Sequence, residues 1–284
     1  MKVFGTMLKG TALAVVALAL AGTAQAAEIK KSPEVAETGK LKIANTMEYA
    51  PFEFVDENGK QVGINIELAE EAAKMMGAEL EVTRMPFPSM IPGLAADRFR
   101  IAWETFSPTE ERLAQVDFVM FLKSGLVVST TPDKKDGFTG DHPLCGKRIG
   151  VIGGTVSDFL IDKMVEECAA QGLEVLDKKV FLEGKDVIQA ALSDRIDGKM
   201  DDATASGYFE VTSGGQMIVL PGLYDEAPLG IAVKKGDADT AAMLEAGLNV
   251  LIANGSYKAI MEKYGLGSAM IDKAFIVDSL DDVN

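Results

Sequence analysis

The stretch Tyr49-Ala-Pro-Phe-Glu-Phe54 begins the part of the chain that decides the fold, and this part continues to Phe118. Asp56-Glu-Asn-Gly59 follows and predicts a hairpin turn, because aspartate, asparagine and glycine suit the backbone angles of tight turns. Thr109-Glu-Glu-Arg112 and Gln115-Val-Asp-Phe118 close the stretch. The turn lacks the acid spacing of an EF-hand loop, so it does not indicate a calcium site.

These motifs, in this order, resemble the type II periplasmic solute-binding proteins of amino-acid ABC importers, bacterial extracellular solute-binding protein family 3. The resemblance continues through Gly153-Gly154-Thr155, residues 197–202 and Leu229-Gly-Ile-Ala-Val233, and covers nearly everything after about Lys40. It implies a two-lobed α/β fold of the periplasmic-binding-protein type II class. Each lobe is then a mostly parallel sheet flanked by helices, and the chain crosses twice between the lobes.

The resemblance also divides the chain. It places residues 38–125 and 232–284 in lobe 1, and residues 126–231 in lobe 2 with hinge strands at its ends. The crossings fall at Ser124-Gly-Leu-Val-Val-Ser-Thr130 and at Ala227-Pro-Leu-Gly-Ile-Ala-Val233. Composition alone does not reveal that lobe 1 comes from both ends of the sequence.

Strands and helices alternate along the sequence. Short apolar runs predict strands at residues 41–44, 80–83, 101–103, 146–152 and 174–181. Apolar residues at helical spacing predict a helix that is capped by Asn65 and ends at Gly77, and further helices at 89–96, 157–170, 185–193, 240–253 and 256–264. Such alternation favours parallel sheets covered by helices, with ligands bound at the carboxyl ends of the strands.

The first 26 residues have the pattern of a cleavable signal peptide. Lys2 and Lys9 precede an apolar run at residues 11–21, and Ala24-Gln25-Ala26 matches the small-x-small motif of signal peptidase sites. The apolar run is shorter than the roughly 20 residues that a membrane-spanning anchor requires. The sequence therefore predicts export to a periplasm without membrane insertion.

Composition narrows the function classes. The formal net charge of −15 at pH 7 opposes binding to nucleic acid and to anionic lipid. Cys145 and Cys168 are the only cysteines, and in an exported protein such a pair predicts a disulfide bond. A single histidine, His142, leaves too few soft ligands for zinc, so we expect no metal and no cofactor.

Two residues align with the family's groups for the ligand α-carboxylate. Arg112 matches an arginine whose planar guanidinium provides two parallel charged hydrogen bonds. Ser107 matches a hydroxyl donor, although Ser107-Pro108 is also typical of a turn and helix cap. Without the resemblance, Arg112 reads as a surface residue paired with Glu110 or Glu111.

Lobe 2 supplies the second half of the predicted site. Gly154-Thr155-Val156 is expected to open a helix near Ser157, whose free N–H groups suit a carboxylate, so Thr155 and Val156 are predicted ligand contacts. Asp202 matches the family carboxylate that faces the ligand α-ammonium, and Asp201 is predicted to face solvent.

Aromatic side chains are predicted to wall the site. Tyr49 and Phe87 flank the apolar part of the ligand, and Phe87 aligns with an aromatic residue of the family's cleft. Phe52 is also a candidate, but it is more typical of a core residue.

One segment departs from the family. The sequence has Trp103-Glu104-Thr105 where family members commonly have a small Ser-Gly pair, and a buried carboxylate needs a partner. In one interpretation, Glu104 meets a positive group of the ligand side chain and Trp103 adds a cation–π face. In the other, Glu104 pairs internally with Arg98 or Arg100. The departure favours a cationic or otherwise unusual amino-acid-like solute, with Glu104 and Thr105 in the site.

The resulting hypothesis is the substrate-binding component of an ABC importer, which captures an amino-acid-like solute by cleft closure and delivers it to a membrane permease. We expect a monomer with no catalytic residues. The alternatives are a periplasmic dehydratase-type enzyme on the same fold, with Glu104 as its acid, and a ligand-sensing partner of a receptor.

Overall fold

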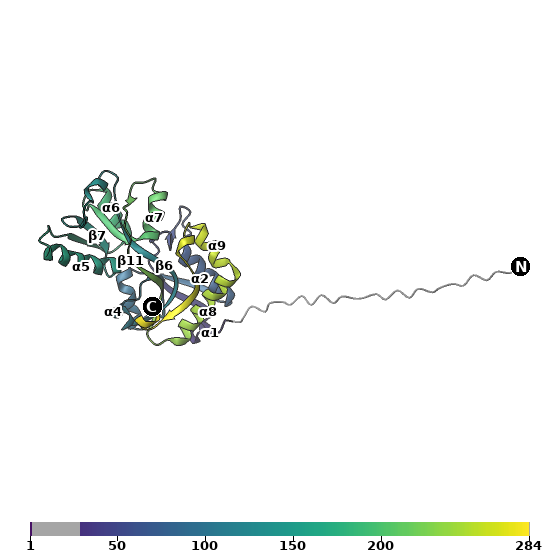
Figure 1. Ribbon diagram of the computed structural model, residues 1–284. Helices are drawn as coiled ribbons and strands as arrows, with labels where there is room; N and C mark the ends of the chain where they lie inside the picture. Colours follow the sequence, from purple (N-terminus) through teal and green to yellow (C-terminus); the bar gives the residue numbers. More distant parts are fainter. Residues whose placement is uncertain (2–28, 284) are drawn as a thin grey trace.

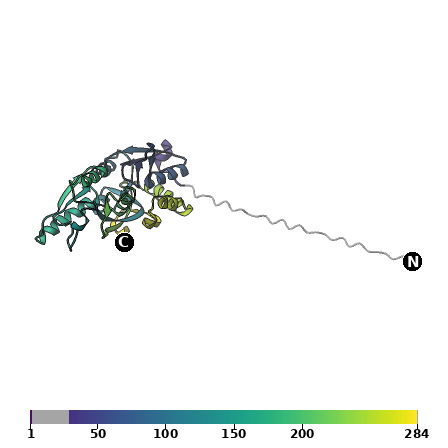
Figure 2. The ribbon, with the colours of Figure 1, turned by 90° about the horizontal axis from the view of Figure 1, so that it is seen from above.

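The computed structural model describes residue 1 and residues 29–283, so the predicted signal peptide lies outside the described residues. Two lobes are visible in Figure 1, with α5, α6, α7 and β7 in one and α1, α2, α8 and α9 in the other. Figure 2 shows that purple and yellow segments, from the two ends of the chain, lie together, apart from the teal and green middle. No helix among the described residues is long and apolar enough to cross a membrane.

The strands of the first lobe are mostly parallel. They include β1 (Lys40–Asn45), β4 (Glu79–Arg84) and β5 (Ile101–Phe106), and β1 pairs in parallel with both β4 and β5. All six residues of β5 are buried, as expected for a strand covered on both faces. The side chains at its carboxyl end therefore point either into the core or into the space between the lobes.

The second lobe repeats this arrangement. β7 (Arg148–Ile152) pairs in parallel with β8 (Asp177–Phe181) and with β9 (Gly198–Asp202). The carboxyl ends of these strands lead into helices that begin at Val156, Gly184 and Ala203. Backbone N–H groups at helix starts thus collect on one edge of this lobe.

Two long strands join the lobes. β6 (Val116–Thr130) pairs antiparallel with β9, and β11 (Tyr224–Lys234) pairs antiparallel with β5 and β6. The sheet order β4-β1-β5-β11-β6-β9-β7-β8 therefore runs through both lobes. The predicted crossings lie inside β6 and β11, while the exact lobe boundaries stay a prediction.

Glycine is required at one point of this crossing. The register of β11 against β6 shifts between Leu229 and Gly230. A side chain at Gly230 would collide with the backbone of Val119, so the two strands approach more closely than any other residue allows.

The predicted alternation of strands and helices is present, with boundaries within a few residues. Helices cover the sheet at α1 (Pro33–Thr38), α2 (Ile64–Met75), α3 (Met90–Ala95), α4 (Glu110–Leu113), α5 (Val156–Ala170), α6 (Gly184–Leu192), α7 (Ala203–Thr212), α8 (Ala238–Asn254) and α9 (Ser256–Lys263). Shorter elements are β2 (Phe54–Val55), β3 (Gln61–Val62), η1 (Phe87–Ser89), η2 (Lys135–Gly137), β10 (Ile218–Val219), η3 (Gly267–Ala269), β12 (Met270–Val277) and η4 (Leu280–Val283).

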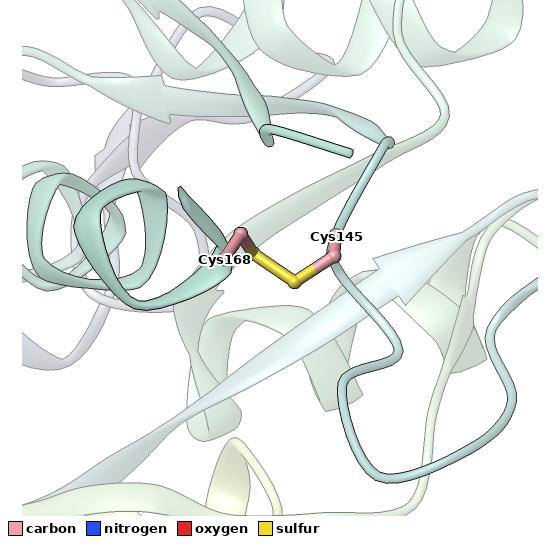
Figure 3. The surroundings of a disulfide bond; sticks show 2 residues. All are labelled: Cys145 and Cys168. Atoms are coloured by element: carbon pink, nitrogen blue, oxygen red, sulfur yellow. A yellow bond between two sulfur atoms is a disulfide. The ribbon is translucent and has the colours of Figure 1, made fainter. Parts of the chain in front are cut away.

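The predicted disulfide is present. Cys145 and Cys168 are bonded, with their Cα atoms 5.7 Å apart. Figure 3 shows that the bond joins α5 to the segment that precedes β7. It therefore ties the main helix of the second lobe to the entry of a neighbouring strand.

Candidate functional site

A cleft lies where the strand ends of the two lobes meet, which is the usual place for a small ligand in α/β sheets. All nine predicted ligand-binding residues line it, although their contact with a ligand stays a prediction. The lining consists of Thr46, Glu48, Tyr49, Phe87, Glu104, Thr105, Ser107, Arg112, Leu126, Ile152, Thr155, Val156, Ser157, Leu182, Glu183, Gly184, Asp201 and Asp202.

Arg112 lies on α4 with only 4% of its surface exposed, so its interpretation as a surface residue is wrong. Its Nη1 donates to the carbonyl of Ser107 at 2.8 Å, and its Nη2 donates to the carbonyl of Gly154 in the other lobe at 2.7 Å. Burial lowers its pKa to about 10, so it remains charged at neutral pH. It is thus a buried cation on the cleft wall with N–H donors to spare.

The ring of Phe87 positions this guanidinium. Phe87 stacks on Phe106 with ring centroids 4.7 Å apart, and the Arg112 Cζ lies 5.7 Å and 5.6 Å from the two ring centres. Flat contact with aromatic rings holds an arginine fork in a fixed plane.

Ser107 does not cap α4. The helix cap is Thr109, whose hydroxyl accepts the Arg112 backbone N–H at 3.3 Å. The Ser107 hydroxyl has no hydrogen-bond partner among the described residues, and Ser107 lines the cleft. Its hydroxyl is therefore available to a ligand, as the predicted role requires.

The N-terminus of α5 faces the cleft from the second lobe. Thr155 is its cap: its hydroxyl accepts the Asp158 N–H at 3.2 Å and donates to the Ile152 carbonyl at 2.7 Å. Gly154 makes the preceding turn with φ of 77°. The Thr155 hydroxyl is thus used within the turn, so the N–H groups of the first helical turn are the groups suited to an anion.

Two aspartates end β9 beside the cleft. Tyr49, from the first lobe, donates its hydroxyl to Asp201 at 2.6 Å and to Asp202 at 3.0 Å. Burial, together with the negative charge of Asp201, raises the pKa of Asp202 to about 7. Burial and both aspartates hold the pKa of Tyr49 well above its usual value.

The prediction that Asp201 faces solvent is wrong. Its side chain is 17% exposed, lines the cleft and pairs with the buried Lys199 at 2.7 Å. Lys199 lies two residues earlier on β9, so it is on the same face of the strand. Asp201 is therefore neutralised within the protein, whereas Asp202 has no ion pair among the described residues.

Glu104 lies at the end of β5 beside a second carboxyl. It is 1% exposed, and its Oε1 accepts the Thr46 backbone N–H at 2.6 Å. Glu53, which is fully buried, neighbours it and accepts hydrogen bonds from the Thr46 hydroxyl at 3.1 Å and the Asn65 amide at 2.6 Å. Burial raises the pKa of Glu104 to about 7, while burial and then the charge of Glu104 raise the pKa of Glu53 well above its usual value.

The interpretation that Glu104 pairs with an internal arginine is wrong, because Arg100 instead lies near Asp97 and Asp237. Neither Glu104 nor Glu53 has a cationic partner among the described residues.

The prediction that Asn65 caps the helix that ends near Gly77 is wrong. Gly63 occupies the cap position, and the Asn65 amide donates to Glu53 at 2.6 Å.

Trp103 is not part of the cleft. It is fully buried in the core of the first lobe, because successive side chains of a strand point to opposite faces and Glu104 takes the cleft side. The proposed cation–π face at Trp103 is therefore wrong. Phe52 is likewise a core residue and stacks under Tyr49 with ring centroids 5.7 Å apart.

Charged side chains from both lobes meet at the rim. Glu48 of the first lobe lies 3.4 Å from Lys185 of the second lobe, and Arg84 lies 2.8 Å from Glu48 and 3.8 Å from Glu183. Lys185 also pairs with Glu183. The two lobes are thus in direct contact across the cleft.

Several lining residues were missed from the sequence. Glu183 and Gly184 follow β8 as Gly154 and Thr155 follow β7, so the rule of parallel strand ends could have identified them. Ser157 lies in the first turn of α5 and carried the same signal. Glu53 carried no such signal, because it approaches Glu104 only through the fold.

Comparisons with known proteins agree with this architecture. An arginine-binding extracellular protein, ArtP of Bacillus subtilis strain 168, is 32% identical over 238 residues, covering 81% of this chain and 89% of that protein. A histidine-binding periplasmic protein of Salmonella typhimurium is 28% identical over 236 residues, covering 79% of this chain and 87% of that protein.

Solved structures of arginine-binding proteins are also similar to this chain. An ancestral arginine-binding protein bound to arginine superimposes with a TM-score of 0.72 at 28% identity, over 80% of this chain and 98% of that one. Holo ArgBP from T. maritima gives a TM-score of 0.70 at 27% identity, over 81% of this chain and 98% of that one. The predicted type II fold is thereby confirmed.

The family model named bacterial extracellular solute-binding proteins, family 3, matches residues 41–267, which include every predicted ligand-binding residue. The chain therefore belongs to the bacterial extracellular solute-binding proteins, family 3.

Proposed function

We propose that this protein captures an amino acid with a cationic side chain and delivers it to the permease of an ABC importer. One observation carries the proposal. A buried cation, Arg112, and an acid without an ion pair, Asp202, line one cleft from different lobes, together with Glu104, which has no cationic partner among the described residues. An amino acid with a second positive charge complements all three groups.

The α-carboxylate of the ligand binds to Arg112 and Ser107. The guanidinium is held in one plane by Phe87 and Phe106, and its unused N–H groups form a bidentate bond. The first-turn N–H groups of α5, next to Thr155 and Val156, add donors from the second lobe.

The α-ammonium binds to Asp202. The positive charge of the ligand stabilises the ionised carboxylate, whose pKa is raised by burial and by Asp201. Tyr49 remains hydrogen-bonded to the aspartates and covers one side of the ligand.

The side-chain cation binds to Glu104. Relatives named as arginine- and histidine-binding proteins support a ligand with a basic side chain. Thr46 fixes the Glu104 carboxylate through its backbone N–H, so this acid is presented to the cleft in one orientation. Thr105 lines the cleft next to it.

Binding proceeds by closure of the lobes about β6 and β11. The ligand first contacts Arg112 and Ser107 on the first lobe, and closure then brings Asp202 and the start of α5 against it. The contact from Arg112 to the Gly154 carbonyl and the rim ion pairs support a closed arrangement of this kind. No covalent chemistry is required.

The partners and location follow from the same proposal. Signal peptidase removes residues 1–26, and the mature protein is a periplasmic monomer that presents its closed form to a permease. The proposed lobes are residues 38–125 with 232–284, and residues 126–231. A sensor or receptor ectodomain that recognises the closed form is the alternative partner.

An enzyme of the dehydratase type is the second candidate function. The observation in its favour is Glu104, an acid with a pKa of about 7 that lines a cleft. Product formation from prephenate or arogenate, abolished in Glu104→Gln, favours the enzyme. Binding of a basic amino acid without turnover favours the importer.

A ligand panel tests the proposal. The purified protein is unfolded and refolded to remove bound solute, and its thermal unfolding is then measured with amino acids, polyamines, betaines and opines. A ligand at a hundred times its dissociation constant adds about 2.7 kcal/mol to the free energy of unfolding, a shift of several degrees. We expect the unfolding temperature to rise with arginine, lysine or histidine. If it rises with none of the α-amino acids, the proposal is contradicted.

A further inference from the structure

The two buried carboxyls at the end of β5 share one hydrogen-bond network. Thr46 donates its N–H to Glu104 and its hydroxyl to Glu53, while Asn65 donates to the second oxygen of Glu53. Thr46 therefore bridges the two carboxyls and holds them side by side. Two adjacent carboxyls in an apolar surrounding without a cation do not both ionise.

The two carboxyls differ in their access to the cleft. Glu104 lines the cleft, whereas Glu53 does not and has no exposed surface. Burial and the neighbouring charge keep the Glu53 proton in place, while the pKa of Glu104 is about 7. Glu104 is therefore the member of the pair whose proton a ligand can displace.

We propose that Glu53 and Glu104 form a proton-gated selectivity site. Glu53 keeps its proton and donates it to Glu104 as a hydrogen bond, so it acts as a positioning residue. Glu104 contacts the ligand side chain: ionised, it binds a cation, and protonated, it binds a neutral polar group. Binding of a cationic side chain releases the Glu104 proton to solvent. This inference rests on the proposed binding of amino acids in the cleft.

Other charged groups near the pair also affect binding. Glu48 at the rim opposes ionisation of Glu104, Arg112 and Asp201 line the same cleft, and Lys199 pairs with Asp201. Asp202 has a pKa of about 7 and binds the α-ammonium in our proposal, so it contributes its own pH dependence. The affinity for arginine alone therefore does not isolate Glu104.

Citrulline provides the matched probe. It has the α-groups and length of arginine, but a neutral ureido group replaces the guanidinium. Effects of Asp202, Arg112 and Tyr49 cancel in the ratio of the citrulline and arginine dissociation constants. That ratio reports only the recognition of the side-chain charge.

The experiment is isothermal titration calorimetry with both ligands on the stripped protein, from about pH 5.5 to about pH 8.5, in buffers of different ionisation enthalpy. With Glu104 titrating at about pH 7, the affinity for arginine rises up to that pH and the affinity for citrulline falls above it, so the preference for arginine rises about tenfold per pH unit across the range. Arginine also releases more protons than citrulline.

Two isosteric variants assign the roles. Glu104→Gln is expected to bring the ratio close to one at every pH, since no carboxylate remains to meet the cation. Glu53→Gln retains the pH profile, because the amide N–H still donates to Glu104 while its oxygen accepts from Asn65 or Thr46. If a variant does not fold, the wild-type profile and proton release still test the gating.

The possible failures are distinct. A constant preference for arginine across the pH range overturns the gating and leaves the proposed function intact. A flat profile in Glu53→Gln assigns the exchanged proton to Glu53 and overturns the division of roles. Absence of binding by both ligands at every pH overturns the proposed function itself.

Discussion

Two groups of charged residues lie at the cleft or directly behind its wall, and they differ in charge balance. Arg112 and Asp202 bring one positive and one negative charge from different lobes, whereas Glu53 and Glu104 bring two carboxyls from the first lobe alone. The first group suits the zwitterion that all α-amino acids share. The second group contains acids only, so the ligand that it favours depends on the charge of the ligand side chain. Recognition of the class and selection of the member are therefore assigned to separate residues.

Arg112→Ala is expected to have the largest effect on binding. Removing one partner of a buried charged hydrogen bond costs about 2–5 kcal/mol, so the affinity for arginine and citrulline should fall by about 30-fold or more. Calorimetry on both ligands measures this loss. Arg98→Ala, at an exposed arginine, is the control and should bind as the wild type does. Loss for arginine only would break the assignment of Arg112 to the shared α-carboxylate.

Removing the disulfide should separate stability from selectivity. The Cys145→Ser/Cys168→Ser variant is expected to lose about 3 kcal/mol in the free energy of unfolding, because the bond closes a loop with a sequence separation of 23 residues. Denaturant unfolding measures this loss. The cysteines do not line the cleft, so both affinities should be unchanged. A changed arginine-to-citrulline ratio would show that the carboxyl pair depends on lobe 2 as a whole.

The unliganded protein should be more stable near pH 5 than near pH 8. A carboxyl whose pKa is higher in the folded state than the unfolded value of about 4 binds more protons when folded, so the free energy of unfolding decreases as pH rises. Glu104, with a pKa of about 7, should contribute on the order of 1–3 kcal/mol across this range.

Thermal unfolding in a pH series, without ligand, measures this contribution. Glu104→Gln should flatten the series, and the part that remains belongs to Asp202 and Glu53, whose pKa values are also raised. Equal slopes in the wild type and Glu104→Gln would contradict the assignment to Glu104. Ligand affinity and intrinsic stability are thus expected to depend on pH in opposite directions.

Tyr49→Phe is expected to have the smallest effect. The hydroxyl donates to Asp201 and Asp202 across the cleft, and the loss of one such bond to a charged group costs about 1–2 kcal/mol. Affinities for arginine and citrulline should weaken equally, by about tenfold. Tyr208→Phe, at a tyrosine outside the cleft lining, is the matched control. An effect on arginine alone would place Tyr49 with the selectivity group instead.

Much of the site was predictable because its residues follow strand ends in a fixed order. Arg112, Ser107, Thr155 and Asp202 were identified from motifs, and the structure places them on one cleft. The wrong predictions concerned which side chains pair with these charged residues. Asp201 was predicted to face solvent, but Lys199 on the same face of β9 neutralises it.

Glu53 shows where the sequence stops being informative. It belongs to the Tyr49–Phe54 motif, but nothing in its spacing relates it to Glu104, which lies 51 positions later in the sequence. The pair forms because β1 and β5 are neighbours and the loop after β1 folds over the end of β5. Pairing of this kind depends on long-range packing, which local patterns do not encode.

The sequence by itself determined the order of strands and helices, the cysteine pair and the identity of the charged residues available to the cleft. These follow from local spacing, side-chain chemistry and motif order. Only the tertiary structure decided that Trp103 enters the core while Glu104 enters the cleft beside Glu53. Charge state and selectivity depend on burial and on the distance between groups, and both arise only when distant segments pack together.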